Sequence, residues 1–234
     1  MPSKWRVTHY LREPLPYASG PTTYAEEGIT LVLEAGKIAR LEHELTVEAD
    51  NPSESEVVVE SHQRLTLLRE ILEFKSHGAA HMSRQTAVCL DKPPESRGLT
   101  LPMLTFSATG TVRTPIDMPD ALPKQSTRLA VWLRLANLAR LAPSPADAIR
   151  NYYLIWEDKR GRPKSGPGAV LKLVRDFVSH GKVNNPDLLA LLEREIGRPV
   201  TQYDPHDPDQ ARFLERHRRS IRQLIAREIE QMLG

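Results

Sequence analysis

The chain has 234 residues, 40% of them hydrophobic, and this length and composition allow one large domain or two small ones with a substantial core. The formal net charge of +2 gives no global basic field that would argue for nucleic-acid binding, although residues 21–60 are acidic and residues 158–164 and 212–227 are basic. The single cysteine, Cys89, excludes an intrachain disulfide and a cysteine-based zinc site, and the eight histidines lack metal-ligand spacing, so we expect no structural metal.

Residues 1–14 contain no apolar core of signal-peptide length. Elsewhere, no run approaches the roughly 18 apolar residues that span a bilayer. We therefore expect a cytoplasmic protein with no membrane-spanning segment.

The first half of the chain, residues 1–122, has the pattern of a β-rich α+β domain. Residues 29–33 and 41–47 flank the turn-like residues 34–37, and apolar and polar side chains alternate along the second run. This alternation predicts a half-buried β-hairpin, in which His43 takes an inward position as a hydrogen-bonded core histidine.

A helix and further strands are predicted after the hairpin. Ser53 or Ser55 is placed to cap a helix whose apolar side chains share one face and which ends before Gly78. The apolar positions of this helix are Val58, Leu65, Leu68 and Leu72. Residues 86–90 and 101–112 then predict strands, separated by a proline-rich turn.

From residue 123 to residue 234 the β signals disappear and helical periodicity takes over. Residues 127–141 are apolar nearly all round, which predicts a central buried helix. Ser144-Pro145-Ala146-Asp147 has the capping serine, the proline and the early acid of a helix start. The sequence therefore predicts an α+β protein, in which a β-containing half is followed by an all-α helical bundle.

Within this bundle, residues 159–168 predict a flexible basic loop. The next helix is expected to bury a stripe of apolar side chains and to close at Gly181, a residue suited to the left-handed position after a helix. The stripe comprises Val170, Leu173, Val174 and Phe177. Two more helices are predicted over residues 186–196 and about 208–233.

The most informative motif is Arg175-Asp176-Phe177-Val178-Ser179-His180. A cationic arginine and a histidine that carries a proton near neutral pH are able to serve a phosphodiester transition state without a metal. One helical turn places Asp176 beside His180 and Arg175 beside Ser179, whereas Arg175 and His180 are about 140° apart on the helical wheel. These two meet around a phosphate if the last turn bends or if a second subunit completes the site, so we expect a homodimer.

The stretch AIRNYYLIWEDKRG, followed by RDFVSHG, resembles the HEPN superfamily, the "higher eukaryotes and prokaryotes nucleotide-binding" domains. More narrowly, it is similar to HEPN domains of the methylamine-utilisation J type and of abortive-infection proteins, which also carry a β-containing N-terminal half. The resemblance covers about residues 123–234, and the first half only in outline.

The resemblance implies a metal-independent endoribonuclease that needs no cofactor and acts in defence or the stress response. In such enzymes paired Arg and His residues of two protomers promote attack of the ribose 2′-OH on the adjacent phosphodiester. Carried onto this chain, Arg175 steadies the phosphate charge and His180 is the general acid or base. Asp176 stands where many members have asparagine, and it places a negative charge beside the scissile phosphate. Glu157 matches a polar accessory residue, and Ser179 is a second accessory candidate.

RNA is the expected partner, and the basic loop supplies the candidate backbone contacts Lys159, Arg160, Arg162 and Lys164. The same loop also fits a solvated linker. The arginine-rich face of residues 212–227 fits a solvated helix surface, and Arg212 with His217 repeats the Arg–His spacing by coincidence.

Two other interpretations stay open at this point. Arg175 and His180 also fit a C-terminal capping pair on a solvated helix end. The alternative function is a non-catalytic HEPN-type module that binds a nucleotide, an RNA or a protein partner. A protein partner would then meet the N-terminal domain, whose acidic hairpin is a poor surface for RNA.

Overall fold

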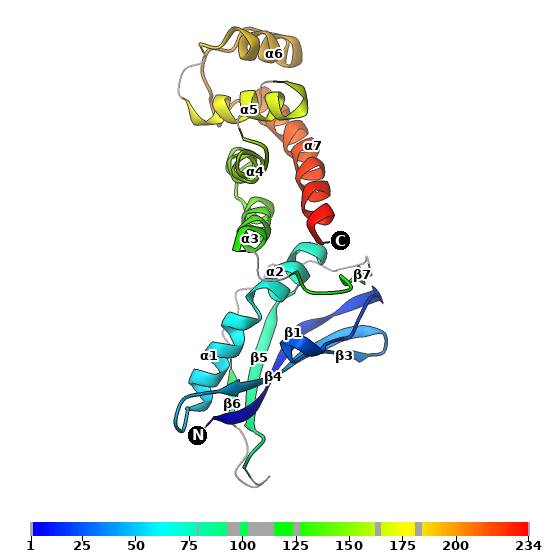
Figure 1. Cartoon of the computed structure of the whole chain (residues 1–234). Helices are drawn as coiled ribbons and strands as arrows, with labels where there is room; N and C mark the ends of the chain where they lie inside the picture. Colours follow the sequence, from blue (N-terminus) through cyan, green and yellow to red (C-terminus); the bar gives the residue numbers. More distant parts are fainter. Residues whose placement is uncertain are drawn as a thin grey trace. The chain divides into compact units, whose positions relative to one another are not determined.

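The computed structural model of the chain describes residues 2–78, 80–92, 99–102, 115–123, 127–161, 165–180 and 184–233. The fold is α+β, as the sequence predicts: a β-sheet with two helices comes first and a region of helices follows (Figure 1). Residue contacts divide the chain into two compact units. The sheet unit comprises Met1–Ala130 with Leu233–Gly234, and the helical unit comprises Val131–Met232.

The sheet has the strand order β2-β3-β4-β1-β5-β6, with β7 paired to β1. Neighbouring strands are antiparallel, except that β7 runs parallel to β1. The strands are β1 (Ser3–Ser19), β2 (Thr23–Tyr24), β3 (Ile29–Glu34), β4 (Lys37–Val47), β5 (Met82–Cys89), β6 (Leu99–Pro102) and β7 (Ile116–Asp117). A short 3-10 helix, η1 (Ala25–Glu27), joins β2 to β3.

The predicted hairpin is confirmed as β3 and β4. Its turn residues Ala35 and Gly36 have φ values of 49° and 73°, the left-handed backbone of tight hairpin turns. In β4 the alternation holds, because Leu41, His43 and Leu45 are buried. This face of the sheet is therefore the core face.

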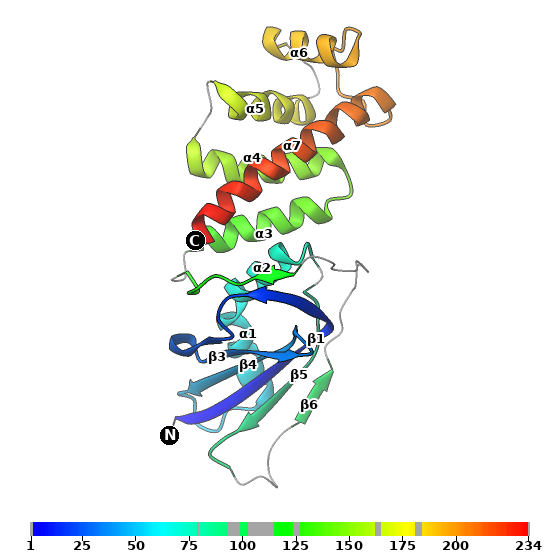
Figure 2. The same ribbon diagram turned by 90° about the vertical axis from the view of Figure 1, so that its right-hand side faces the viewer.

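Helices α1 (Glu54–Arg64) and α2 (Thr66–Lys75) follow the hairpin and lie along one face of the sheet (Figures 1 and 2). Ser53 caps α1, and Glu56 completes a capping box, because its carboxylate accepts from the Ser53 backbone N–H at 2.8 Å. The predicted single helix is wrong, since the chain breaks at Leu65 into two. The apolar face is confirmed: Val58, Leu65, Leu68 and Leu72 are all buried.

Strands β1, β2 and β7 have no counterpart among the strands predicted from the sequence. A strand is predicted at residues 86–90, whereas β5 begins earlier, at Met82. Of the strand predicted over residues 101–112, the structure describes only residues 101 and 102, which end β6; residues 103–112 lie outside the described residues.

The helical unit stacks four helices in chain order, and α7 runs along the side of this stack (Figure 2). The helices are α3 (Thr127–Leu141), α4 (Pro145–Arg160), α5 (Gly166–Ser179), α6 (Pro186–Ile196) and α7 (Pro208–Leu233). The bounds predicted for α6 and α7 are confirmed. The boundary between the two units falls inside α3.

Two burial predictions in this unit are only partly confirmed. In α3 one side is buried around Trp132 and Leu133, but Val131, Leu138 and Leu141 are exposed. In α5 Val174 and Phe177 are buried as predicted, whereas Val170 is exposed and Leu173 half-buried. Gly168, Leu171 and Val178 complete the buried face. The physical reason is that neighbours contact only one side of each helix, and apolar content does not say which side. Among the described residues, no helix combines the length and the apolar composition needed to cross a membrane.

Candidate functional site

Helix α4 supports the candidate site, and its start is formed as the sequence predicts. The Ser144 hydroxyl accepts from the Asp147 backbone N–H at 3.2 Å, and Pro145 occupies the first turn. Asp147 also pairs with Arg150 at 2.8 Å, and the Arg150 guanidinium donates to the Val178 carbonyl of α5. This arginine therefore satisfies a backbone carbonyl in the last turn of α5.

A glycine allows α5 to pack closely on α4. A Cβ added to Gly168 would lie 2.6 Å from ring atoms of Trp156, well inside van der Waals contact. At the other end of α5, the buried Phe177 ring meets Tyr203 and Phe213 edge-on, with centroids 5.4 and 6.0 Å away. These contacts fix the rotation of α5 and hence the directions of its polar side chains.

Asp176 is the centre of the polar cluster at the end of α5. Its carboxylate lies 2.8 Å from the Lys172 ammonium and 2.9 Å from the Arg175 guanidinium. The imidazole Nε2 of His180 is 3.9 Å from the same carboxylate, outside hydrogen-bond range. The structure thus brings Arg175, Asp176 and His180 together, but the aspartate holds the two cations more tightly than it orients the histidine.

Arg175 is half-buried, with 23% of its side chain exposed. Its guanidinium stacks on the Tyr153 ring of α4, with the central carbon 4.1 Å from the ring centroid. The Tyr153 hydroxyl in turn donates to Glu157 at 3.3 Å. Glu157, the predicted accessory residue, therefore reaches Arg175 through one tyrosine.

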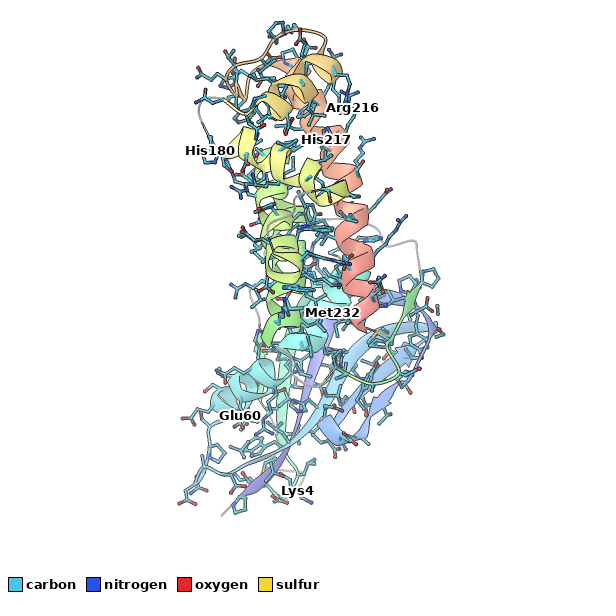
Figure 3. All side chains as sticks on the ribbon, turned by 45° about the horizontal axis from the view of Figure 1, so that its top comes forward. Lys4, Glu60, His180, Arg216, His217 and Met232 are labelled. Atoms are coloured by element: carbon cyan, nitrogen blue, oxygen red, sulfur yellow. The ribbon has the colours of Figure 1, made fainter. Side chains whose placement is uncertain are left out.

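His180 is the residue at which α5 ends. It has extended backbone angles, its N–H donates to the Asp176 carbonyl at 3.0 Å, and its side chain is 64% exposed (Figure 3). Ser179, the other accessory candidate, is exposed. Gly181, where the sequence predicts closure of the helix, lies outside the described residues. An imidazole this open to solvent can exchange protons with a bound substrate.

The predicted basic loop is partly wrong, because Lys159 and Arg160 form the last turn of α4. Both cations pair with the buried Glu228 of α7, with 2.9 Å between Arg160 Nη2 and the carboxylate. Burial alone would raise the pKa of Glu228, but hydrogen bonds from Lys159 and Arg160 hold it below its ordinary value. These two side chains connect helices, while Arg162 and Lys164 lie outside the described residues.

Arg212 and His217, which have the same sequence spacing as Arg175 and His180, each make contacts of their own in the structure. Arg212 is paired with Asp209 on the same helix. His217 lies 3.1 Å from a Glu195 carboxylate oxygen and packs against the Phe213 ring, with centroids 4.5 Å apart. The two side chains therefore serve separate contacts.

The predicted inward, hydrogen-bonded position of His43 is confirmed. This histidine belongs to a larger buried polar network in the sheet unit, which the sequence does not predict. The Gln85 amide nitrogen donates to His9 Nδ1 at 2.8 Å. His9 Nε2 and His43 Nδ1 lie 2.9 and 2.8 Å from the Ser61 hydroxyl oxygen of α1. Because His9 accepts at Nδ1, its Nε2–H donates to Ser61, and the Ser61 hydroxyl then donates to His43. Arg69 donates to the neighbouring His62.

Both core histidines are neutral at ordinary pH. Burial, assisted by the nearby His62, His43 and Arg69, lowers the pKa of His9 to about 3. Burial and the positive charge of Arg64 lower the pKa of His43 to about 4, against a hydrogen bond to the Glu27 backbone. The network therefore separates two apolar clusters without placing a charge between them.

A serine hydrogen-bonded to a histidine is also the pairing of a nucleophile with its base. Here Ser61 and His9 are both 0% exposed, so a substrate has no access to either atom. The network is structural. Two sequence signals point to it: the two-residue period of β4 places His43 inward, and that of β1 places His9 between the inward-facing Val7 and Leu11.

Within the described ranges, no group of three or more His, Cys, Asp or Glu side chains is placed to hold a metal ion. Comparisons of the chain with protein-family models, with curated proteins and with solved structures give no match.

Proposed function

We propose that the chain is a metal-independent endoribonuclease of HEPN type, which cuts RNA at a site formed by Arg175 and His180 of two protomers. The observation that carries the proposal is the cluster around Asp176, where two cations and an exposed imidazole share one helix end. We further propose that the protein is cytoplasmic and acts in defence or the stress response, as the HEPN resemblance implies.

In the proposed reaction the ribose 2′-OH attacks the adjacent phosphorus, and the bond to the 5′ oxygen breaks. His180 transfers a proton to or from one of these oxygens, because its imidazole is exposed and reaches solvent at the helix end. Arg175 donates to the non-bridging oxygens as negative charge develops on them. The products carry a 2′,3′-cyclic phosphate and a free 5′-OH.

The arrangement within one chain supports a site that a second protomer completes. The Arg175 guanidinium is already engaged by the Tyr153 ring and by Asp176. His180 stands at the helix end with its side chain in solvent. A partner's helix end would supply the opposing Arg–His pair and exclude water from the phosphate.

The alternative is a non-catalytic module that binds RNA, a nucleotide or a protein. One observation favours it: Asp176 neutralises part of the positive charge next to His180. In that case the cluster would still bind a phosphate, but replacement of His180 would leave the RNA chain intact and change affinity only.

The test is cleavage of a labelled RNA pool in EDTA by the wild type, by His180→Ala and by His206→Ala. His206 is an exposed histidine before α7 and serves as the matched control. We expect the wild type and His206→Ala to leave 2′,3′-cyclic phosphate ends, and His180→Ala to lose about 100-fold or more in rate. Equal rates for all three proteins would leave the binding module as the better account.

A further inference from the structure

A second candidate site lies in the helical unit, away from the end of α5. It is a pocket of about 350 Å³ between α3, α4 and α7. Its lining residues are Arg140, Tyr152, Glu215, Arg218, Arg219 and Arg222. The volume falls in the range of small-molecule sites, roughly 300–1,000 Å³. None of the residues clustered around Asp176 lines it.

Positive charge dominates this arginine pocket, since four guanidinium groups face one carboxylate. Glu215 forms a two-point contact with Arg218, with N–O distances of 2.8 and 2.9 Å, and it accepts from Arg219 at 3.2 Å. Glu215 is the single acid among the residues that line the pocket. It also orients the Arg218 guanidinium, which keeps further N–H donors for a ligand.

Tyr152 shows that the positive charges converge on one point. Its side chain is buried, and burial raises the pKa of the phenol above its ordinary value. The charges of Arg222, Arg218 and Arg140 act on the same hydroxyl in the opposite direction. The positive charges of three arginines, on α3 and α7, therefore all act on the Tyr152 hydroxyl.

A neighbouring pocket between α6 and α7 is lined by arginines and acids in equal number. It is about 460 Å³ in volume and is lined by three arginines and three acids, together with Ile196. Two of these arginines have dedicated partners, since Arg212 pairs with Asp209 and Arg216 contacts Glu195. The lining of the arginine pocket, by comparison, contains four arginines and one acid.

We propose that the arginine pocket binds a ligand carrying two or more adjacent phosphate groups, with Tyr152 as part of its wall. Guanidinium forks match phosphate oxygens in geometry and charge, and several forks around one cavity favour a polyphosphate over a single phosphate. Two sources have this chemistry, a free nucleoside polyphosphate and the backbone of an RNA strand. This inference is independent of cleavage at His180.

The experiment is calorimetric titration of the full-length protein with inorganic tripolyphosphate, with ATP, and with a single-stranded RNA lacking terminal phosphates. The pocket variant is Arg218→Ala with Arg222→Ala, and the matched control is Arg212→Ala with Arg216→Ala on the same helix. We expect affinity to fall about ten-fold for each pocket arginine removed, and to change less than about three-fold in the control. Arg222→Gln alone, at an exposed position, repeats the test with minimal effect on packing.

Tighter binding of tripolyphosphate or ATP than of RNA, lost in the pocket variant, supports the pocket and identifies a small polyphosphate as its ligand. Tighter RNA binding with the same loss supports the pocket and identifies the RNA backbone. Two results would overturn the proposal: no binding of any of the three probes by the wild type, or equal losses in the pocket and control variants.

Discussion

Asp176 determines how much of the Arg175 charge is available to a phosphate. Its carboxylate contacts both Lys172 and Arg175, and it lies 3.9 Å from His180. The aspartate therefore positions the cations but also adds a negative charge where a scissile phosphate would bind. The two effects oppose each other, and one substitution separates them.

Asp176→Asn removes this charge and keeps an oxygen that accepts from Lys172 or Arg175. We expect the variant to cleave RNA about ten-fold faster, because repulsion of a nearby phosphate is relieved. Single-turnover rates measure the effect, and Glu193→Gln, which removes an exposed charge from α6, is the control. A slower Asp176→Asn enzyme would show that positioning outweighs repulsion.

His9 and His43 make the stability of the sheet unit depend on pH. Their pKa values of about 3 and about 4 in the folded chain lie below the value of 6.5 in an unfolded chain. At pH values between the folded and the unfolded pKa of each histidine, only the unfolded state binds a proton on that imidazole. The free energy of unfolding therefore falls as pH drops below 6.5. At pH 5 each histidine costs about 2 kcal/mol relative to pH 7.

His43→Gln should therefore reduce the pH dependence of unfolding by about 2 kcal/mol between pH 7 and pH 5. Hydrogen exchange of peptides from β1 and β4, followed by mass spectrometry at the two pH values, reports the opening of this unit. His206→Gln, at an exposed position, is the control. Identical pH dependence in wild type and His43→Gln would contradict the assignment of a neutral buried histidine.

At the scale of elements, the contact between α4 and α5 positions the candidate site. Gly168 permits it, because any larger residue meets the Trp156 ring at 2.6 Å. The rotation of α5 fixed in this way places Arg175 on Tyr153 and leaves His180 in solvent.

Gly168→Ala should lower the free energy of unfolding by about 1–3 kcal/mol, because overpacking forces the two helices apart. Thermal unfolding measures the loss, and the same substitution in a Trp156→Leu background is the control. The smaller side chain should remove most of the penalty, a coupling that a double-mutant cycle detects. Equal losses in both backgrounds would rule out the ring contact as the cause.

The sequence predicts the elements whose pattern is strong and local. The hairpin of β3 and β4 follows from strict alternation, and the start of α4 from the capping residues after Ser144. β1 escapes prediction because Pro14 and Pro16 interrupt its pattern and a histidine occupies an inward position. The break between α1 and α2 at Leu65 is not predicted, because no glycine or proline marks it in the sequence.

The candidate site also has one part that the sequence predicts and another that it does not. The spacing of Arg175, Asp176 and His180 in the sequence predicts that Asp176 lies near both of the other residues. The stacking of Arg175 on Tyr153 depends on how α5 packs on α4, and the arginine pocket depends on three helices. Tertiary contacts of this kind leave no periodic signal in the sequence.

At the scale of the whole molecule, the proposed nuclease activity depends on the assembly of two protomers. One helix end carries an exposed His180 and an Arg175 that stacks on Tyr153, and under the proposal a symmetric partner would complete the site. The proposal therefore makes a prediction about mixed dimers that no single variant tests.

The most direct measurement is RNA cleavage in EDTA by a mixture of Arg175→Ala and His180→Ala proteins after subunit exchange. Each variant alone is expected to be inactive. A mixed dimer retains one intact Arg175 and one intact His180 on different chains, so we predict that mixing restores about a quarter of the wild-type rate. Mixing Arg175→Ala with the Arg175→Ala/His180→Ala double variant is the control and should restore nothing. A mixture no more active than its separate components would contradict a composite site built from two protomers.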